Sequence, residues 1–351
     1  MATLSKVTSE TKFIIKWGSI IISTLLIVFI VAKIGPVIKE KFYPTPPPPP
    51  TVSFGKLEAL KFPTNATDKV LKYTLDTISG TLPIFPDRAK IYKITPNRAD
   101  FLSLEKAQDK VSKLGFGTQK SLISENTYQW IDRTTLLRKI AFNILSSDFT
   151  FSSSFVTDPT IQSGINLPNE SEAINIAKTF LESLSSFPND INTTKTKTSY
   201  HTIKNYTIIP STSISKAQII RVDFFQNNID KLPIYYPKPI SSTINLLISG
   251  GQDNPQVVEA LYSYKNISNE SATYPIKSAS NAFLELKQGK AYISSFAGKD
   301  INVAIKNMAL AYYLGKEEQK YLMPIIIFEG DNDFFAYISA VKEEWVNEDG
   351  R

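Results

Sequence analysis

Residues 13–34 read FIIKWGSIIISTLLIVFIVAKI, and this apolar stretch separates a short N-terminal tail from everything that follows it. Between Lys16 and Lys33 it carries no charge, over slightly fewer than the roughly 20 residues that a bilayer-spanning helix requires. The two lysines lengthen the span because their side chains reach the headgroups, and Trp17 lies where an interfacial aromatic residue is expected. The sequence therefore predicts a membrane anchor at residues 13–38, with the lipid bilayer as a partner.

Two other interpretations of this stretch fit less well. A cleavable signal peptide would end in small residues of the A-x-A type, whereas this stretch ends in Val-Ala-Lys-Ile. A buried core helix would need a core to enter, and a proline-rich segment follows instead. Lysines lie on both sides in similar number, so charge does not decide the orientation. The short tail before the anchor and the large remainder behind it favour a cytoplasmic tail at residues 1–12 and an extracytoplasmic C-terminal part.

Proline dominates the segment that follows the anchor. Residues 43–50 read YPTPPPPP, and such a run adopts an extended polyproline II rod. We interpret residues 39–52 as a spacer that holds the folded part away from the bilayer. The remainder of the 351-residue chain is long enough for more than one domain. Three α+β units are predicted, at residues 53–165, 166–270 and 271–351.

Composition narrows the chemistry that this chain can perform. It contains one histidine and no cysteine, which excludes disulfides, thiolate nucleophiles and zinc sites built from Cys and His. The net charge of +6 is spread along the chain without a basic run, so no nucleic-acid partner is expected. No cofactor and no metal are expected either.

Three segments carry the pattern of a capped amphipathic helix. Their predicted N-caps are Ser103, Asn169 with a glutamate three residues later, and Ser278. The first and third helices end at Gly115 and Gly289, where a glycine can adopt a left-handed cap. An apolar stripe at helical spacing follows each cap, which predicts that each helix packs on a sheet.

Strand patterns follow each of these helices. The cleanest alternation places Ile220, Val222 and Phe224 opposite Arg221 and Asp223, as in a half-buried antiparallel strand. The predicted fold class is α+β, with antiparallel sheets each crossed by a capped helix. The strands are predicted at residues 71–77, 89–94, 127–132, 136–151, 200–209, 217–225, 243–248, 256–264, 303–314, 321–328 and 334–345.

The C-terminal stretch carries a family resemblance. YPIKSASNAFLELKQGKAYI at residues 274–293, followed by VAIKNMALAYYLG, YLMPIIIFEG and FFAYISAVKEEW, resembles the PepSY-like units of bacterial envelope proteins, particularly the YycH/YycI type of membrane-anchored regulators. The earlier part, with FGKLEALKFP after the spacer and TLDTISGTLPIFP beyond it, is similar to uncharacterised anchored proteins of candidate-phylum bacteria, a likeness that implies no activity. The resemblance implies a module that binds a neighbouring protein, typically a sensor kinase, and performs no chemistry itself. The matching positions are Ala282, Leu286, Gly289, Tyr312, Pro324, Phe328, Tyr337 and Ala340.

Several motifs resemble reactive or ligand-binding sites. His201 has no G-x-S-x-G nucleophile elbow elsewhere in the chain, so we interpret it as a solvent-facing or hydrogen-bonded strand residue. Glu329, Asp331 and Asp333 lack the twelve-residue loop of an EF-hand, and a hairpin turn explains them without calcium. The two glycines in residues 248–253 lack the G-K-[ST] of a phosphate loop, and they predict a second hairpin.

Adjacent carboxylates at Glu343 and Glu344, beside Trp345, suggest glycoside cleavage. Neighbouring residues of a strand point to opposite faces, however, so this pair cannot converge on one bond. A cell-wall-directed hydrolase remains the alternative function, with acidic catalytic residues in the loops at 188–199 or 228–242.

Tyrosines supply the remaining candidates for a binding site. Tyr262, Tyr264, Tyr312 and Tyr337 lie in predicted strands, and tyrosine on a sheet surface suits contact with a protein or a glycan. No catalytic residue is assigned. The sequence thus predicts a single-pass, extracytoplasmic binding or regulatory module of the bacterial envelope, whose partner is a membrane protein such as a sensor kinase, or a wall polymer.

Overall fold

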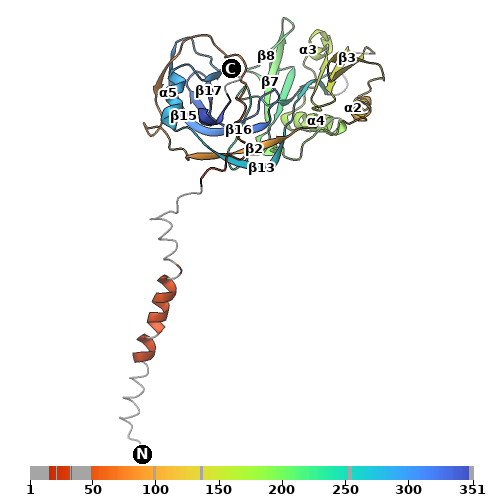
Figure 1. Cartoon of the computed structure of the whole chain (residues 1–351). Coiled ribbons are helices and arrows are strands. Elements are labelled where there is room, and N and C mark those ends of the chain that lie inside the picture. Colours follow the sequence, from red (N-terminus) through yellow and green to blue (C-terminus); the bar gives the residue numbers. More distant parts are fainter. Residues whose placement is uncertain are drawn as a thin grey trace, which may run out of the picture. The chain divides into compact units, whose positions relative to one another are not determined.

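A computed structural model gives the arrangement of the chain, which divides into the units Met1–Pro49 and Pro50–Arg351 (Figure 1). In the first unit Lys16, Trp17 and Lys33 are helical, and no helix in the described residues is both long and apolar enough to cross a membrane. The predicted tail at 1–12 and residues 39–48 of the predicted spacer lie outside those residues. The structure describes residues 16–20, 22–31, 33, 49–97, 100–134, 137–251 and 255–347.

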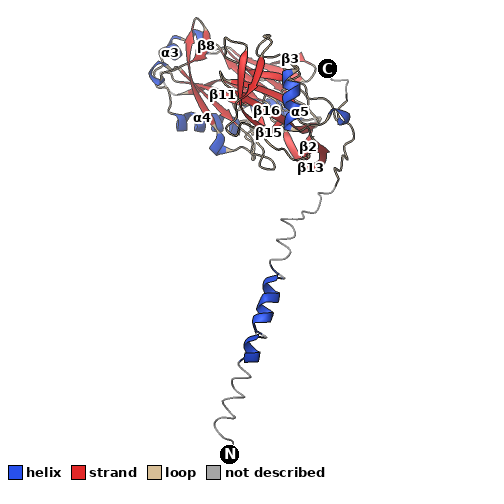
Figure 2. Ribbon diagram, turned by 90° about the vertical axis from the view of Figure 1, so that its left-hand side faces the viewer, coloured by secondary structure: helices blue, strands red, loops and turns tan. Residues whose placement is uncertain are grey.

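The unit Pro50–Arg351 has an α+β structure rich in strands, which confirms the predicted fold class (Figure 2). The helices are α2 (Ser103–Ser112), α3 (Pro159–Gln162), α4 (Glu170–Ser183) and α5 (Ala279–Lys287), with short 3₁₀ turns η1 (Phe155–Thr157), η2 (Thr193–Lys195), η3 (Ile214–Lys216) and η4 (Glu343–Trp345). A nine-stranded sheet contains β3 (Lys120–Ser124), β4 (Thr127–Asp132), β5 (Arg138–Asn143), β6 (Phe149–Ser153), β7 (Lys197–Lys204), β8 (Thr207–Pro210), β9 (Ile219–Phe224), β11 (Ile244–Ser249) and β12 (Gln256–Tyr262). An eight-stranded sheet contains β1 (Lys72–Leu75), β2 (Arg88–Thr95), β10 (Ile234–Tyr235), β13 (Asn266–Pro275), β14 (Tyr292–Ser295), β15 (Asn302–Tyr313), β16 (Tyr321–Gly330) and β17 (Phe334–Ser339).

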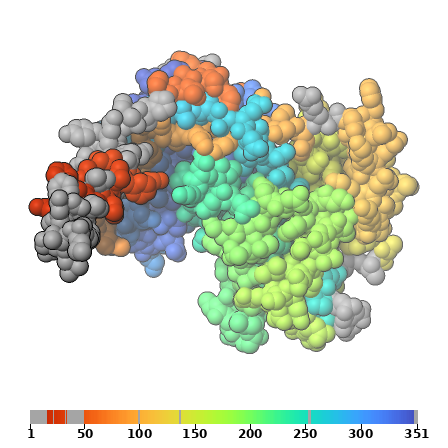
Figure 3. Space-filling model, turned by 90° about the horizontal axis from the view of Figure 1, so that it is seen from below, coloured from red at the N-terminus to blue at the C-terminus, as the bar shows by residue number. Residues whose placement is uncertain are grey.

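The nine-stranded sheet is antiparallel throughout, in the order β3-β4-β5-β6-β12-β11-β9-β7-β8. Helix α4 packs across β9, β11 and β12, and α2 contributes Ala107 and Val111 to the same core. The indole Nε1 of buried Trp130 donates a hydrogen bond of 2.8 Å to Gln108 Oε1, which joins β4 to α2. From below, the yellow-green segment around α4 forms the outer surface of this part (Figure 3).

The eight-stranded sheet is built around the hairpin of β15 and β16, and α5 packs against β17. Its pairing is mixed, because β1 and β10 both run parallel to β15. The chain leaves the nine-stranded sheet after β9, adds β10 to this second sheet and returns to β11. This crossing ties the two sheets together within one compact unit.

The strands form two sheets, whereas the sequence predicted antiparallel sheets each crossed by a capped helix. Capped α4 crosses the antiparallel nine-stranded sheet and shares its core with α2, but the eight-stranded sheet that capped α5 packs against contains parallel pairs. The predicted unit at 53–165 contributes strands to both sheets, with β1 and β2 in one and β3 to β6 in the other. Local patterns predict helices and strands but not which distant strands pair.

Two of the three predicted helix caps are correct. At α4 the Asn169 side chain accepts from Glu172 N–H and the Glu172 carboxylate accepts from Asn169 N–H, both at 3.0 Å. Ser278 Oγ accepts from Asn281 N–H at the start of α5. Ser103, in contrast, already lies inside α2, whose N-cap position is residue 102.

Some predicted strand boundaries need correction. The segments at 136–151 and 200–209 are each two strands joined by a turn, and the strand predicted at 334–345 ends at Ser339. Glu343 and Glu344 therefore lie in the 3₁₀ turn η4 and not in a strand. Strand β13 escaped prediction because its first half, rich in Asn and Ser, has weak strand propensity that pairing with β2 overrides.

Gly289 ends α5 in the left-handed conformation, with φ of +74°. A Cβ atom there would meet no heavy atom within 4 Å, so the cost of a side chain is backbone strain alone. We expect Gly289→Val to lower the free energy of unfolding by about 1 to 2 kcal/mol. Gly289→Asn is the control, because asparagine tolerates this conformation better. Chemical denaturation of both variants measures the difference, and equal stabilities would contradict the explanation.

Candidate functional site

A cleft of about 660 Å³ lies between the two sheets. Strands β6, β9, β11 and β12 line it with the face of the nine-stranded sheet opposite α4, and β14 and β15 line it from the eight-stranded sheet. Residues 61–66 and 236–243 complete its walls. The face toward α4 is apolar, whereas the opposite face is polar at the cleft, where Arg221, Asn245 and Glu259 line it, and apolar further along, where Ile219 and Leu247 are buried.

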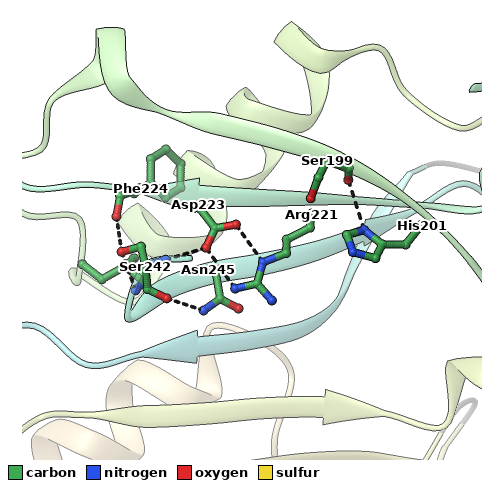
Figure 4. Close-up of polar contacts among 8 residues, drawn as sticks. Ser199, His201, Arg221, Asp223, Phe224, Ser242 and Asn245 are labelled. Carbon is green, nitrogen blue, oxygen red and sulfur yellow. Dashed lines mark hydrogen bonds and ion pairs between the residues drawn. The ribbon is translucent and has the colours of Figure 1, made fainter. Parts of the chain in front are cut away.

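A buried ion pair forms the polar floor of the cleft. Arg221 and Asp223 are two residues apart on β9, so their side chains point to the same face (Figure 4). Arg221 Nε and Nη2 donate to the two carboxylate oxygens of Asp223 at 2.7 and 2.9 Å, a bidentate geometry. The Asp223 side chain is 5% exposed and that of Arg221 is 26% exposed, so the guanidinium alone borders the open space.

The network continues into the segment before β11. Asp223 Oδ1 also accepts from the Ser242 N–H at 2.7 Å, and Asn245 Nδ2 donates to the Ser242 carbonyl at 2.8 Å. Asn245 lies directly opposite Asp223 in the β9–β11 ladder. Ser242 Oγ donates to the Phe224 carbonyl and accepts from Ile244 N–H. These bonds fix the side chains of the floor in one arrangement.

Some of the charged side chains around the cleft have an oppositely charged neighbour, and others form no ion pair with a described residue. Burial raises the pKa of Glu259, and the positive charge of Arg221 partly offsets this. Lys61, Lys238 and Lys316 line the cleft, and none of them forms an ion pair with a described residue. The rim of the cleft therefore offers free positive charge.

The wall on the side of the eight-stranded sheet is aromatic. Phe62 stacks on Tyr292 with ring centroids 5.2 Å apart and contacts Tyr313 at 4.8 Å. The hydroxyls of Tyr292 and Ser294 donate to the Pro237 carbonyl. The hydroxyl of Tyr313 is buried and has no hydrogen-bond partner among the described residues, and burial raises its pKa.

The four tyrosines predicted as interaction residues do not form a surface. Tyr262, Tyr312 and Tyr337 are at most 6% exposed and belong to three different core clusters, so they are not accessible to a partner. Alternation along a strand does not reveal that both faces of its sheet are covered, so these tyrosines were expected at a surface. Tyr264 is half-buried and borders a neighbouring depression of about 630 Å³.

His201 is a hydrogen-bonded strand residue, as predicted. It lies on β7 with Nδ1 at 3.3 Å from the Ser199 carbonyl oxygen (Figure 4). Burial lowers the pKa of its imidazole, and the nearby cation of Arg221 lowers it further. The Asp223 carboxylate accepts from Arg221 and Ser242 rather than from the imidazole, so the described residues do not assemble a Ser-His-Asp triad here.

The two hairpins predicted from acidic and glycine-rich motifs are confirmed. Asn332 and Asp333 adopt positive φ between β16 and β17, as a tight turn requires. Asp331 Oδ1 accepts from Ala304 N–H at 3.0 Å, and Glu329 accepts from the Tyr235 hydroxyl at 3.3 Å. The glycine pair after β11 likewise opens the connection to the antiparallel β12.

These protein partners lead us to expect no calcium site at this turn. The full-length protein should melt at the same temperature in calcium and in a chelator, because a cation that bound only the native state would stabilise it. Differential scanning calorimetry in the two buffers measures this. A rise of several degrees in calcium would show that the carboxylates exchange their protein partners for a metal.

The loops expected to hold acidic catalytic residues have structural contacts instead. Asp190 Oδ2 accepts from Gln226 Nε2 at 2.8 Å. Asp230 accepts from the Tyr92 hydroxyl at 2.5 Å and forms an ion pair with Lys90. Neither aspartate lines the cleft, so the structure does not bring these two carboxylates together with its floor.

Comparison with known proteins leaves the family open. No family model matches the chain, and no curated protein matches it. Two similar solved structures are an uncharacterized protein from Eubacterium rectale ATCC 33656 (12% identity, 80% of this chain, 92% of that chain, TM-score 0.36) and the Bacillus megaterium YpeB C-terminal domain (11% identity, 70% of this chain, 95% of that chain, TM-score 0.33). At these TM-scores neither likeness bears on fold or activity. The resemblance of the C-terminal stretch to PepSY-like units stays a prediction.

Proposed function

We propose that this protein is a non-enzymatic binding module of the bacterial envelope, held at the membrane by its N-terminal apolar stretch, and that the cleft between its sheets is the binding site. Its C-terminal strands and α5 would form the PepSY-like unit. One observation supports the proposal above the others. The floor of the cleft is fixed by buried hydrogen bonds, whereas the lysines on its rim have no ion-pair partners among the described residues.

The composition of the cleft favours binding over catalysis. The described lining residues include no histidine, and their carboxylates are Glu259 on the sheet and Glu317 in the loop after β15. A fixed polar floor beside an aromatic wall is the arrangement of a pre-organised ligand site. A neighbouring membrane protein is the partner that this function requires.

Site-specific photo-crosslinking in intact cells tests where the partner binds. A photo-reactive amino acid at Ser241, which lines the cleft, should form a discrete adduct. The same amino acid at Lys204, exposed on β7 outside the cleft, is the matched control and should form none. Equal labelling from both positions, or no adduct from Ser241, would overturn the proposal.

A second variant separates binding from hydrolysis. His201→Ala should leave both the stability and the cellular function unchanged, because the imidazole contacts a backbone carbonyl and does not line the cleft. Complementation of a deletion strain, with thermal unfolding of the purified variant, provides the measurement. Loss of function in a stably folded variant would favour the wall-directed hydrolase.

A further inference from the structure

The cleft is one end of a longer groove across the polar face of the nine-stranded sheet. A depression of about 260 Å³ adjoins it and shares Thr150, Leu261 and Lys316 with it. A third, of about 630 Å³, shares Asn143 and Lys316 with the second. Lys316 borders all three depressions, so we treat them as one continuous groove with this lysine at its centre.

The loop that carries Lys316 is held in a fixed shape. Gln319 accepts from the Gly315 N–H at 3.0 Å, and its Nε2 donates to the carbonyls of Tyr313 and Tyr321 at 2.9 and 2.7 Å. One side chain thus closes the connection between β15 and β16. Lys316 is exposed at the tip of this loop and has no ion pair with a described residue.

The cations that line the groove, seven among the described residues, outnumber its four carboxylates, Asp148, Glu259, Glu317 and Glu318. At the far end Lys93, Lys265 and Lys320 also line it, but these are already paired with Glu270, Asp148 and Glu58. The free cations are the three lysines of the cleft rim, Lys61, Lys238 and Lys316. A ligand that follows the groove would place negative charge near each of them.

The walls of the groove fit a peptide better than a glycan. Sugars stack on free aromatic faces, whereas Phe62 is stacked against Tyr292 and tilted against Tyr313. Residues 61–64 line the cleft, and their backbone makes no hydrogen bond to any described residue. A free backbone of this kind can pair with the main chain of an extended peptide.

We propose that the groove binds an extended acidic peptide segment, whose carboxylates lie on Lys61, Lys238 and Lys316 and whose backbone follows residues 61–64. This inference rests on the proposed function and names the ligand class of the same site.

Fluorescence anisotropy with the full-length protein in detergent tests the ligand class. The probe is a fluorescein-labelled peptide of alternating Glu and Thr, and the comparison ligands are the matching Lys-Thr peptide and chitotetraose. The acidic peptide should bind saturably and more weakly at high salt, because exposed charges are screened. Lys316→Glu should weaken its binding at least tenfold, whereas the control Lys204→Glu should leave it unchanged.

Each other outcome contradicts the inference. Equal binding of the basic peptide, or an affinity that Lys316→Glu does not alter, would overturn the charge argument, and preference for chitotetraose would identify a glycan site. Failure of the acidic peptide alone, with the Ser241 adduct still formed in cells, would refute the ligand class and leave the proposed binding function standing. Loss of both signals would refute both.

Discussion

Asp223→Ala should lower the free energy of unfolding by about 3 kcal/mol. The carboxylate is buried, and it accepts two hydrogen bonds from Arg221 and one from Ser242 N–H. Its removal leaves the Arg221 side chain, which is only 26% exposed, without its counter-ion, and the buried Ser242 N–H without this acceptor. Denaturant titration of the purified protein measures the loss.

A surface ion pair provides the matched control for this prediction. Glu270 and Lys93 lie 3.2 Å apart with half or more of each side chain exposed, so Glu270→Ala should change stability by less than about 1 kcal/mol. If Asp223→Ala cost no more than Glu270→Ala, the network in the cleft floor would not be a determinant of the fold. The conclusion that buried hydrogen bonds position the cleft would then be wrong.

The helices were predictable because their signals are local. The stripe Ala177, Leu181 and Leu184 needs only a 3.6-residue period and a cap to identify α4, and all three side chains are buried as that pattern requires. The pattern of α5 is equally local, with Ala282 and Leu286 buried. Neither pattern contains information about which sheet each helix covers.

The binding site depends on contacts that the sequence does not reveal. Alternation on β9 correctly predicts one apolar face, but it also suggests that Asp223 faces solvent, whereas Asp223 is 4% exposed. Asp223 is contacted by the backbone N–H of Ser242, which lies nineteen positions further along the chain. No local pattern marks such a contact, so the cleft floor was missed.

The tyrosines were misassigned for a related reason. Tyr337 packs against Tyr292 and Tyr313, at centroid distances of 5.7 and 6.2 Å, in a core cluster built from residues of four strands, β14 to β17. The number of aromatic residues suggested an exposed surface, but mutual packing removes these rings from solvent. This packing could be predicted only from the knowledge that β14, β15 and β17 lie in one sheet.

Gly250→Ala should also destabilise the protein by about 3 kcal/mol, at the upper end of overpacking effects. A Cβ atom at Gly250 would lie 2.1 Å from the Ile165 carbonyl oxygen and 2.7 Å from the Leu167 nitrogen. Both are backbone atoms that cannot rotate away, and the Gly251 N–H donates to the same Ile165 carbonyl at 3.0 Å. The absence of a side chain at Gly250 therefore permits the contact between the end of β11 and the segment that precedes α4.

Gly117→Ala is the control for this substitution, because a Cβ atom there meets nothing within 4 Å. It should leave the midpoint of urea unfolding nearly unchanged, whereas Gly250→Ala should lower it strongly. A larger side chain tolerated at Gly250 would mean that the segment before α4 moves freely away from β11. The glycine pair would then be explained by its turn alone, as the sequence first suggested, and the close approach of these two segments would not contribute to stability.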